Sequence, residues 1–180
     1  MEKQKLLEFL ACPVCQAPLT EFSACAACGE AFSEDDGTPN FMPSRGTRTV
    51  SFSYTPQRST VDDATLRSFF KFPPRHGEDK ALPFRMDAAF GDLIETLPQG
   101  STMLEIGCGG GQVRQWTEDK GLQYVGTDIS KIRIPELLQA HGGPDLLSDA
   151  HFLAFRDERF DVVYASAVME HLACPALAVQ

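Results

Sequence analysis

The segment over residues 102–128 restricts the possible folds more than any other part of this 180-residue chain. An apolar run over residues 102–106 predicts a buried strand, and four of the next five residues are glycine. An amphipathic segment over residues 113–120 predicts a helix, and a second short apolar run ends on Asp128. Strand, glycine loop, helix and strand in this order indicate a parallel α/β sheet, in which ligands bind at the carboxyl ends of the strands.

The glycine loop and Asp128 have the features of a nucleoside-binding site. Glycines let the backbone turn sharply and let a ligand lie against it, and the start of the following helix presents free N–H groups. A carboxylate at the tip of the second strand can accept hydrogen bonds from both hydroxyls of a ribose. The dinucleotide pattern GxGxxG is not matched, because Gln112 stands where its third glycine belongs. We therefore predict cofactor contacts from Asp128 and from the loop residues Gly107, Gly109 and Gly111.

Glu105 stands two residues before the first glycine and completes the motif LEIGCGGG. This motif resembles the first motif of the class I S-adenosylmethionine (SAM)-dependent methyltransferases, (E/D)xGxGxG. The resemblance implies a Rossmann-like α/β sheet and SAM as the cofactor, with Glu105 and Ile129 among the residues that bind it. A generic nucleotide-binding turn or a plain tight βα loop is the alternative interpretation.

A second block supports the same resemblance. The chain reads DAHFLAFRDERFDVVYASAVMEHL from Asp149 onward, which is similar to the family pattern DAxxLPFxDxxFDVVxxxxVxEHL with one alanine in place of the usual proline. By that resemblance Asp149 accepts a hydrogen bond from the adenine amino group, and Ala150 and His151 border the adenine through their backbone. Ser166, just past the fourth strand, would face the methionine end of the cofactor or the substrate.

A catalytic residue is harder to predict. His171 is the one candidate for a general base, although a lone histidine at the start of a helix is more often a packing or capping residue. Methyl transfer from an activated donor mainly requires held geometry and excluded water, so no nucleophile motif is needed.

Four cysteines near the N-terminus form two CxxC pairs: Cys12 with Cys15 and Cys25 with Cys28. Two such turns on adjacent hairpins predict a tetrahedral Cys₄ site for a structural Zn²⁺ ion. A ribbon this small buries little apolar area, so metal binding would contribute to its folding energy. Two disulfides, or iron in a rubredoxin-like site, are the alternatives.

The surrounding segment over residues 5–43 resembles the zinc ribbons of the Trm112-type methyltransferase activators and their bacterial relatives. Its second CxxC pair is followed by the turn DGTP and then by the apolar pair Phe41 and Met42. The resemblance implies that the metal is structural. It also implies a second possible function, a non-catalytic module that docks or activates a partner.

We expect three parts: a zinc ribbon over residues 1–44, a linker and lead-in helix over 45–84, and the cofactor-binding half of a methyltransferase domain over 85–180. The linker includes a predicted helix over residues 62–72, and a further apolar stripe predicts a helix over 85–97 that packs on the sheet. The predicted strands have the spatial order 3-2-1-4. The sheet is expected to be truncated after strand four, which suggests a fragment of a longer protein.

Charge and hydropathy restrict the partners. The net charge of −9 does not attract phosphate backbones, and no apolar stretch of about 18 residues predicts a membrane span. The N-terminus lacks the pattern of a signal peptide, so a cytoplasmic location is expected. A small metabolite, an RNA or a protein could be the methyl acceptor, and the acidic balance favours the first. The oligomeric state is not indicated.

Overall fold

The computed structural model describes residues 2–43, 88–131 and 135–179. The expected linker and the helix predicted over residues 62–72 lie outside the described residues. In the parts of the chain that the structure describes, no helix combines the length and apolarity that a membrane crossing requires.

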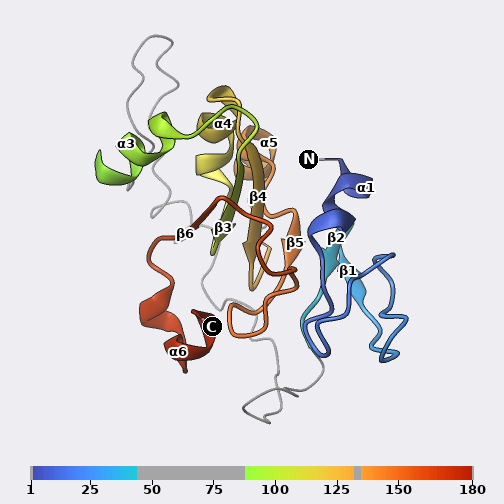
Figure 1. Ribbon diagram of the computed structural model, residues 1–180. Coiled ribbons are helices and arrows are strands. Elements are labelled where there is room, and N and C mark those ends of the chain that lie inside the picture. The colour runs from blue at the N-terminus through green and yellow to red at the C-terminus, as the bar shows by residue number, and fades with distance from the viewer. Residues whose placement is uncertain (1, 44–87, 132–134, 180) are drawn as a thin grey trace.

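One six-stranded sheet organises the molecule, in the order β1-β2-β5-β4-β3-β6 (Figure 1). The four strands after residue 100 run parallel to one another: β3 (Thr102–Ile106), β4 (Gln123–Asp128), β5 (Leu146–Leu147) and β6 (Val162–Ala165). Their spatial order is the predicted 3-2-1-4. The α/β, Rossmann-like sheet expected from the glycine loop is therefore confirmed.

Two helices pack on one face of this sheet. They are α3 (Ala88–Thr96), within the helix predicted over residues 85–97, and α4 (Gln112–Asp119), which follows the glycine loop. Their contact with the sheet is a small apolar cluster: Ile94, Met103, Val113, Leu122 and Tyr124. Three further helical segments are α5 (Pro135–His141), the 3₁₀ turn η2 (Met169–His171) and α6 (Pro175–Ala178).

The N-terminal segment consists of α1 (Lys3–Leu6), the 3₁₀ turn η1 (Leu7–Phe9) and the antiparallel hairpin of β1 (Ser33–Asp35) and β2 (Thr38–Asn40). The hairpin is not separate from the sheet. Strand β2 runs parallel to β5, with Asn40 opposite Leu147, and the Phe41 N–H donates to the Leu147 carbonyl at 2.8 Å. This pairing was not predicted, and it makes the hairpin an extension of the parallel sheet.

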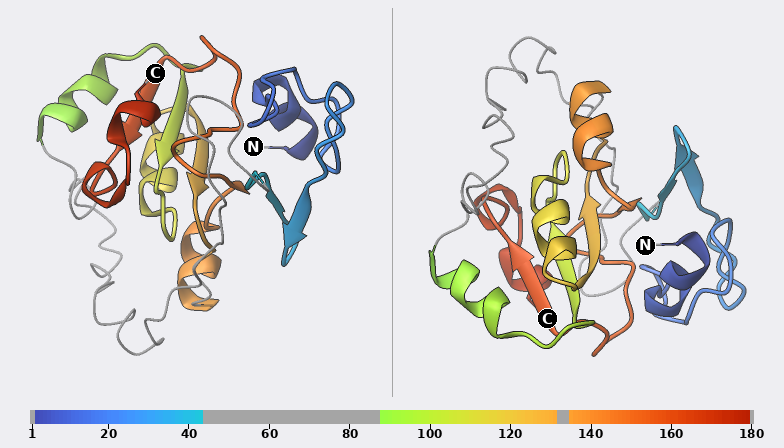
Figure 2. Two further views of the ribbon diagram at one scale, coloured as in Figure 1. Left: turned by 90° about the horizontal axis from the view of Figure 1, so that it is seen from below. Right: turned by 90° about the horizontal axis from the view of Figure 1, so that it is seen from above.

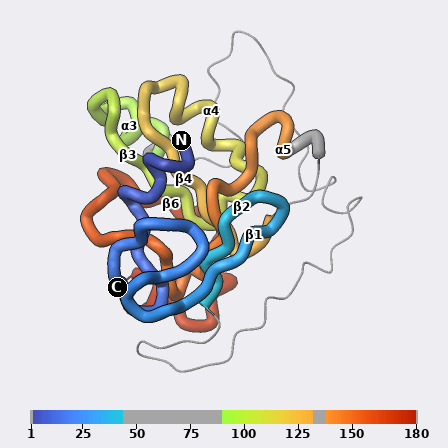
Figure 3. Tube along the Cα trace, turned by 90° about the vertical axis from the view of Figure 1, so that its right-hand side faces the viewer, coloured from blue at the N-terminus to red at the C-terminus, as the bar shows by residue number. Residues whose placement is uncertain are grey.

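The same segment covers the second face of the sheet. Residues 148–161 join β5 to β6 without a helix, and the N-terminal segment lies against them (Figures 2 and 3). The Ala11 N–H donates to the Ala154 carbonyl at 3.0 Å, and the Arg156 N–H donates to the Phe9 carbonyl at 2.8 Å. The N-terminal segment thus occupies the layer that a crossover helix would fill in a βαβ unit.

Apolar packing joins the N-terminal segment to the parallel sheet. Leu104 and Ile106 of β3 share one cluster with Leu10 and Phe41 of the N-terminal segment, and the last two are fully buried. Phe9 also stacks on Phe160, with 5.3 Å between the ring centres. Burial of each such side chain contributes about 1.5–3 kcal/mol. The N-terminal segment and the parallel sheet therefore have one continuous hydrophobic core.

Candidate functional site

The first candidate site is the cysteine cluster. The Sγ atoms of Cys12, Cys15, Cys25 and Cys28 all lie within 4.8 Å of one another. All six cysteines of the chain are free of disulfides, and two Sγ pairs are 3.7 Å (Cys12 and Cys28) and 3.6 Å (Cys15 and Cys25) apart. A disulfide requires about 2.05 Å, whereas a tetrahedral site with metal–sulfur bonds of about 2.3 Å separates its sulfurs by about 3.8 Å. The cluster has the dimensions of a metal site.

Burial and backbone N–H groups act in opposite directions on the pKa values of these cysteines. Burial raises the pKa of Cys12 to about 12, because the charged form loses its water. Burial also acts on Cys25, but the N–H groups of Cys28 and Ala27, together with hydrogen bonds to the thiols of Cys15 and Cys28, outweigh it and lower the pKa of Cys25 to about 7. The cluster offers four ligand atoms from two turns, and this donor set suits a closed structural site.

The second candidate site is the loop between β3 and α4. The loop leaves β3 with Gly107 at φ 71°, and a Cβ at that position would collide with Cγ2 of Val168, just past β6. It ends with Gly111 at φ 82°, which is the N-cap of α4. A Cβ on Gly111 would lie 3.0 Å from the His141 carbonyl oxygen. Glycine is therefore required at both ends of the loop by backbone angle and by close contact.

Asp128 lies at the end of β4 and reaches this loop. Its carboxylate accepts the N–H of Gly109 at 2.8 Å and the N–H of Ser130 at 3.1 Å. Burial raises the pKa of Asp128, and the N–H groups of Gly109, Ser130 and Ile129 oppose that rise. A desolvated carboxylate thus borders the glycine loop, while the side chain of Ile129 is about half exposed, at 49%.

Glu105 is buried in β3, on the face that α3 and α4 cover. Its side chain accepts a hydrogen bond from the hydroxyl of Tyr124. Burial raises its pKa to about 7, against the lowering effects of Tyr124 and of the Arg114 charge, and Asp128 adds to the rise. Glu105 therefore lies beneath the loop, in contact with Tyr124 of β4.

Asp149 follows β5 and is buried. Its Oδ1 accepts the backbone N–H of His151 at 2.8 Å and lies 2.6 Å from Nδ1 of the same histidine. On the other side of the ring, Nε2 accepts the N–H of Cys174 at 3.1 Å. The histidine thus links the loop after β5, where the half-buried Ala150 also lies, to the segment that follows β6.

The two remaining predicted residues follow β6. Ser166 is half-buried directly after that strand, and His171 is exposed at the end of η2. Together with Val168, which contacts the start of the glycine loop, these residues place the segment after β6 beside the loop.

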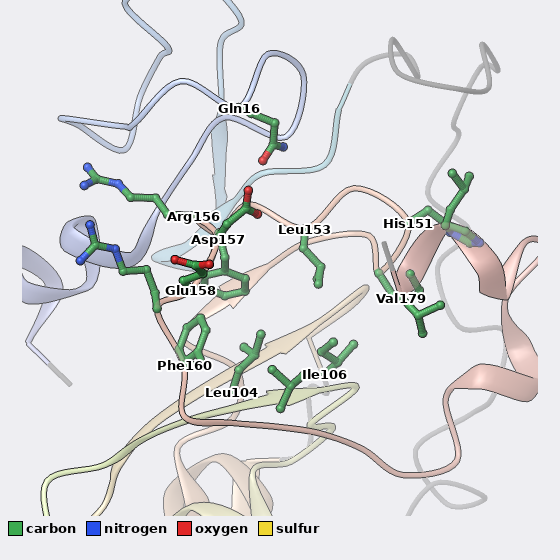
Figure 4. Close-up of a pocket in the computed structure, with 16 residues that line it drawn as sticks. Gln16, Leu104, Ile106, His151, Leu153, Arg156, Asp157, Glu158, Phe160 and Val179 are labelled. Atoms are coloured by element: carbon green, nitrogen blue, oxygen red, sulfur yellow. The ribbon is translucent and has the colours of Figure 1, made fainter.

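A cavity of about 430 Å³ opens on the sheet face that carries the N-terminal segment (Figure 4). Leu104 and Ile106 of β3 line its floor. Charged side chains from Arg156 to Arg159 line one end, and His151 and Val179 lie at the other. The cavity is adjacent to the predicted adenine residues, because Ala150 and His151 are part of its wall.

Sequence reasoning missed the partners of Glu105. Tyr124 and Arg114 were expected only as strand and helix residues, yet both approach Glu105 under the loop. One signal could have found them: Gly126, a glycine inside a strand, which often marks a close approach of other groups. A Cβ there would lie 2.7 Å from the Tyr124 hydroxyl and 3.0 Å from Sγ of Cys108.

Two protein families match this chain. The Trm112p-like protein family matches residues 3–129, and the methyltransferase domain family matches residues 104–180. The two matches overlap over residues 104–129, which include the glycine loop and Asp128. The overlap lies in the part of the sheet that shares a core with the N-terminal segment.

Individual relatives are methyltransferases. The chain is 35% identical over 140 residues to a ubiquinone biosynthesis O-methyltransferase of Cereibacter sphaeroides, covering 65% of this chain and 56% of that protein. It is 34% identical over 85 residues to the 2-methyl-6-phytyl-1,4-hydroquinone methyltransferase of Synechocystis sp., covering 44% of this chain and 26% of that protein. It is 34% identical over 81 residues to a tRNA (carboxymethyluridine(34)-5-O)-methyltransferase of Arabidopsis thaliana, covering 45% of this chain and 19% of that protein.

The likeness to these relatives covers only part of their length. The chain spans about half, 56%, of the ubiquinone biosynthesis O-methyltransferase of Cereibacter sphaeroides. Both family matches agree with the motifs read from the residues, since the first contains both CxxC pairs and the second contains the glycine loop. The chain therefore belongs to the Trm112p-like family, and that region is joined in it to a class I SAM methyltransferase domain.

Proposed function

We propose that this protein transfers a methyl group from SAM to a small-molecule acceptor, with the Cys₄ ribbon as a structural part of the same fold. The observation that carries the proposal is the hydrogen bond between Asp128 and Gly109. It brings a half-buried carboxylate to the edge of a glycine-rich loop at the carboxyl end of a parallel sheet, where nucleosides bind in such folds.

The residues present fit SAM. The carboxylate of Asp128 accepts backbone N–H groups at both oxygens and, with about four acceptor positions, has capacity left for a ribose hydroxyl. The loop residues Gly107, Gly109 and Gly111 would border the amino-acid end, with Glu105 beneath them. Asp149 and Ala150 would border the adenine, and Ile129 and Ser166 the remaining walls.

When bound, SAM supplies an activated methyl group that an acceptor nucleophile displaces in line. The protein then has to orient the two partners and exclude water. Val168 lies against the start of the loop, and this contact supports our proposal that the segment after β6 borders the methyl end of the site. His171 of that segment remains the candidate for removing a proton from the acceptor.

We propose Zn²⁺ as the metal of the cysteine cluster, because four thiolates form a closed tetrahedral site. We also propose the division into a ribbon (1–44), a linker with lead-in helix (45–84) and a cofactor-binding part (85–180). Cysteines without disulfides are typical of a reducing compartment, so we propose a cytoplasmic location.

A small acceptor is favoured over RNA by charge and by the relatives. The net charge of −9 repels a phosphate backbone, and the names of two of the relatives refer to a quinone and a hydroquinone. The name of one relative refers to a tRNA. Turnover of SAM with a catechol or hydroquinone, and with total tRNA, distinguishes these acceptors.

A second function is favoured by one observation, the Trm112p-like match over residues 3–129. In this case the chain would dock or activate a partner without catalysis. Binding of SAM without turnover of any acceptor class would support it.

Calorimetric titration with SAM and with NAD tests the proposal. SAM should bind and NAD should not. Asp128→Ala should weaken SAM about tenfold to a hundredfold, because a hydrogen bond to a charged group contributes about 1.5–3 kcal/mol. Asp119→Ala, which removes an exposed acid from the end of α4, is the matched control and should bind as the parent does. Binding of NAD alone, or an Asp128→Ala variant with parental affinity for SAM, would refute the assignment.

A further inference from the structure

Arg114 lies in the first turn of α4 and holds the turn that leads into β5. Its guanidinium donates to the Gly143 carbonyl and to Oδ2 of Asp145, both at 2.9 Å. The two side chains of this ion pair are only 15% and 14% exposed. Oδ2 of Asp145 also accepts the N–H of Gly126 in β4 at 2.8 Å. One arginine therefore connects α4, β4 and the turn before β5.

The turn at Gly143 also supports the glycine loop. The Gly143 N–H donates to the Gly110 carbonyl at 3.2 Å. A Cβ on Gly111 would lie 3.0 Å from the His141 carbonyl oxygen and 3.3 Å from that of Gly143. The outer side of the loop is thus packed directly against the backbone that Arg114 holds in place.

The same guanidinium lies over the ring of Tyr124, with Cζ 4.6 Å from the ring centre. Tyr124 donates its hydroxyl hydrogen bond to Glu105, directly beneath the loop. The titratable groups that act on Glu105 are Tyr124 and Arg114, which favour its carboxylate, and Asp128, which opposes it. Glu105 in turn raises the pKa of the buried Cys108 thiol, after burial itself.

We propose that Arg114, anchored by Asp145, is a positioning residue for the cofactor: it fixes the shape of the glycine loop from outside and keeps a positive charge beside the Tyr124–Glu105 pair beneath it. The inference rests on the proposed binding of SAM. It assigns to Arg114 a role in cofactor affinity and in its pH dependence, although Arg114 itself does not touch the predicted ligand position.

Two effects on SAM binding follow. First, Arg114→Met releases the turn from the loop and weakens SAM about tenfold, the size expected when a network residue rather than a ligand contact is lost. Second, SAM is a cation, so it binds more tightly when Glu105 is ionised, and loss of the Arg114 charge moves that ionisation to higher pH. In Arg114→Met, the pH at the midpoint of the change in SAM affinity should therefore rise by about one unit.

The experiment is a set of calorimetric titrations with SAM from about pH 5.5 to about pH 9. Lys120→Met is the matched control, because Lys120 at the other end of α4 also pairs with an acid, Glu95, and also approaches an aromatic ring, that of Trp116. Its affinity and pH midpoint should equal those of the parent. The amino group of SAM titrates identically with every variant, so a difference between variants reports on the protein.

Asp145→Asn provides a second variant in case Arg114→Met does not fold. It keeps the size of the side chain while removing the charge that anchors Arg114, and it should weaken SAM about threefold. Because Arg114 keeps its charge in this variant, the midpoint should not rise as it does in Arg114→Met. Parental affinity and an unchanged midpoint in either folded variant would overturn this inference alone. Absence of SAM binding by the parent would overturn the proposed function and this inference with it.

Discussion

The two faces of the parallel sheet are covered in different ways. Leu104 and Ile106 of β3 point to an apolar layer made by the N-terminal segment, whose cysteine cluster has the dimensions of a metal site. The intervening residue, Glu105, faces α4 and a network of charged and hydroxyl groups. The comparison shows that alternate residues of one strand serve separate tasks: one face holds the fold together, and the other shapes the loop that we propose for the cofactor.

The largest effect should come from breaking the cysteine cluster. Cys25→Ser removes one buried ligand, so the chain should lose its metal, about one zinc per molecule by elemental analysis, and several kcal/mol of stability. The apolar face of the sheet would then lose its cover, and a dye that binds exposed apolar surface should report this. Cys174→Ser is the control, since Cys174 lies outside the cluster. Parental metal content in Cys25→Ser would contradict the assignment.

A smaller effect should come from the apolar layer itself. Phe41→Ala empties a fully buried position between the hairpin and the sheet and should cost about 3–5 kcal/mol in chemical denaturation. Ile94→Ala makes the corresponding change on the helix face and should cost about 2–5 kcal/mol. Both variants should unfold in a single transition with the rest of the chain, because the sheet is common to both layers. Two separate transitions in Phe41→Ala would show that the faces fold independently.

The smallest effect should be the pH dependence of stability that Glu105 causes. It belongs to the helix-covered face of the sheet alone. The pKa of Glu105 in the folded protein is about 7, above the ordinary value of 4.5, so the folded state binds more protons than the unfolded state between these two values. Stability should therefore fall as pH rises through this window, by roughly 3 kcal/mol at most. Glu105→Gln should remove this fall, whereas Glu95→Gln, at an exposed carboxylate, should keep it. Equal pH dependence of stability in Glu105→Gln and the parent would contradict the raised pKa.

Much of the parallel sheet could be predicted because its signals are local. The apolar runs, the glycine loop and the helix stripe before β3 each lie within a few residues of one another, and the order of the four strands follows from their connections. The cysteine cluster could be predicted for the same reason, since the two CxxC pairs are close in sequence.

The unpredicted features depend on contacts between distant residues. The pairing of Asn40 with Leu147 joins two short strands with no sequence pattern in common. The Arg114 network depends on where long side chains reach after folding, and hydrophobic periodicity does not describe that. The roles of Asp128, Asp149 and the other predicted cofactor residues stay predictions until ligand binding is measured.

The parallel pairing of β2 with β5 also has a consequence for biosynthesis. The ribbon leaves the ribosome before its partner strand at residues 146–147, which follows only after residues 44–145 have been made. Closing so long a loop is slow, because chain entropy must be lost before the contact forms. During this interval a metal bound by the four cysteines would keep the ribbon folded by local bonds. The nascent chain would then present a finished edge on which the sheet can assemble as its strands emerge.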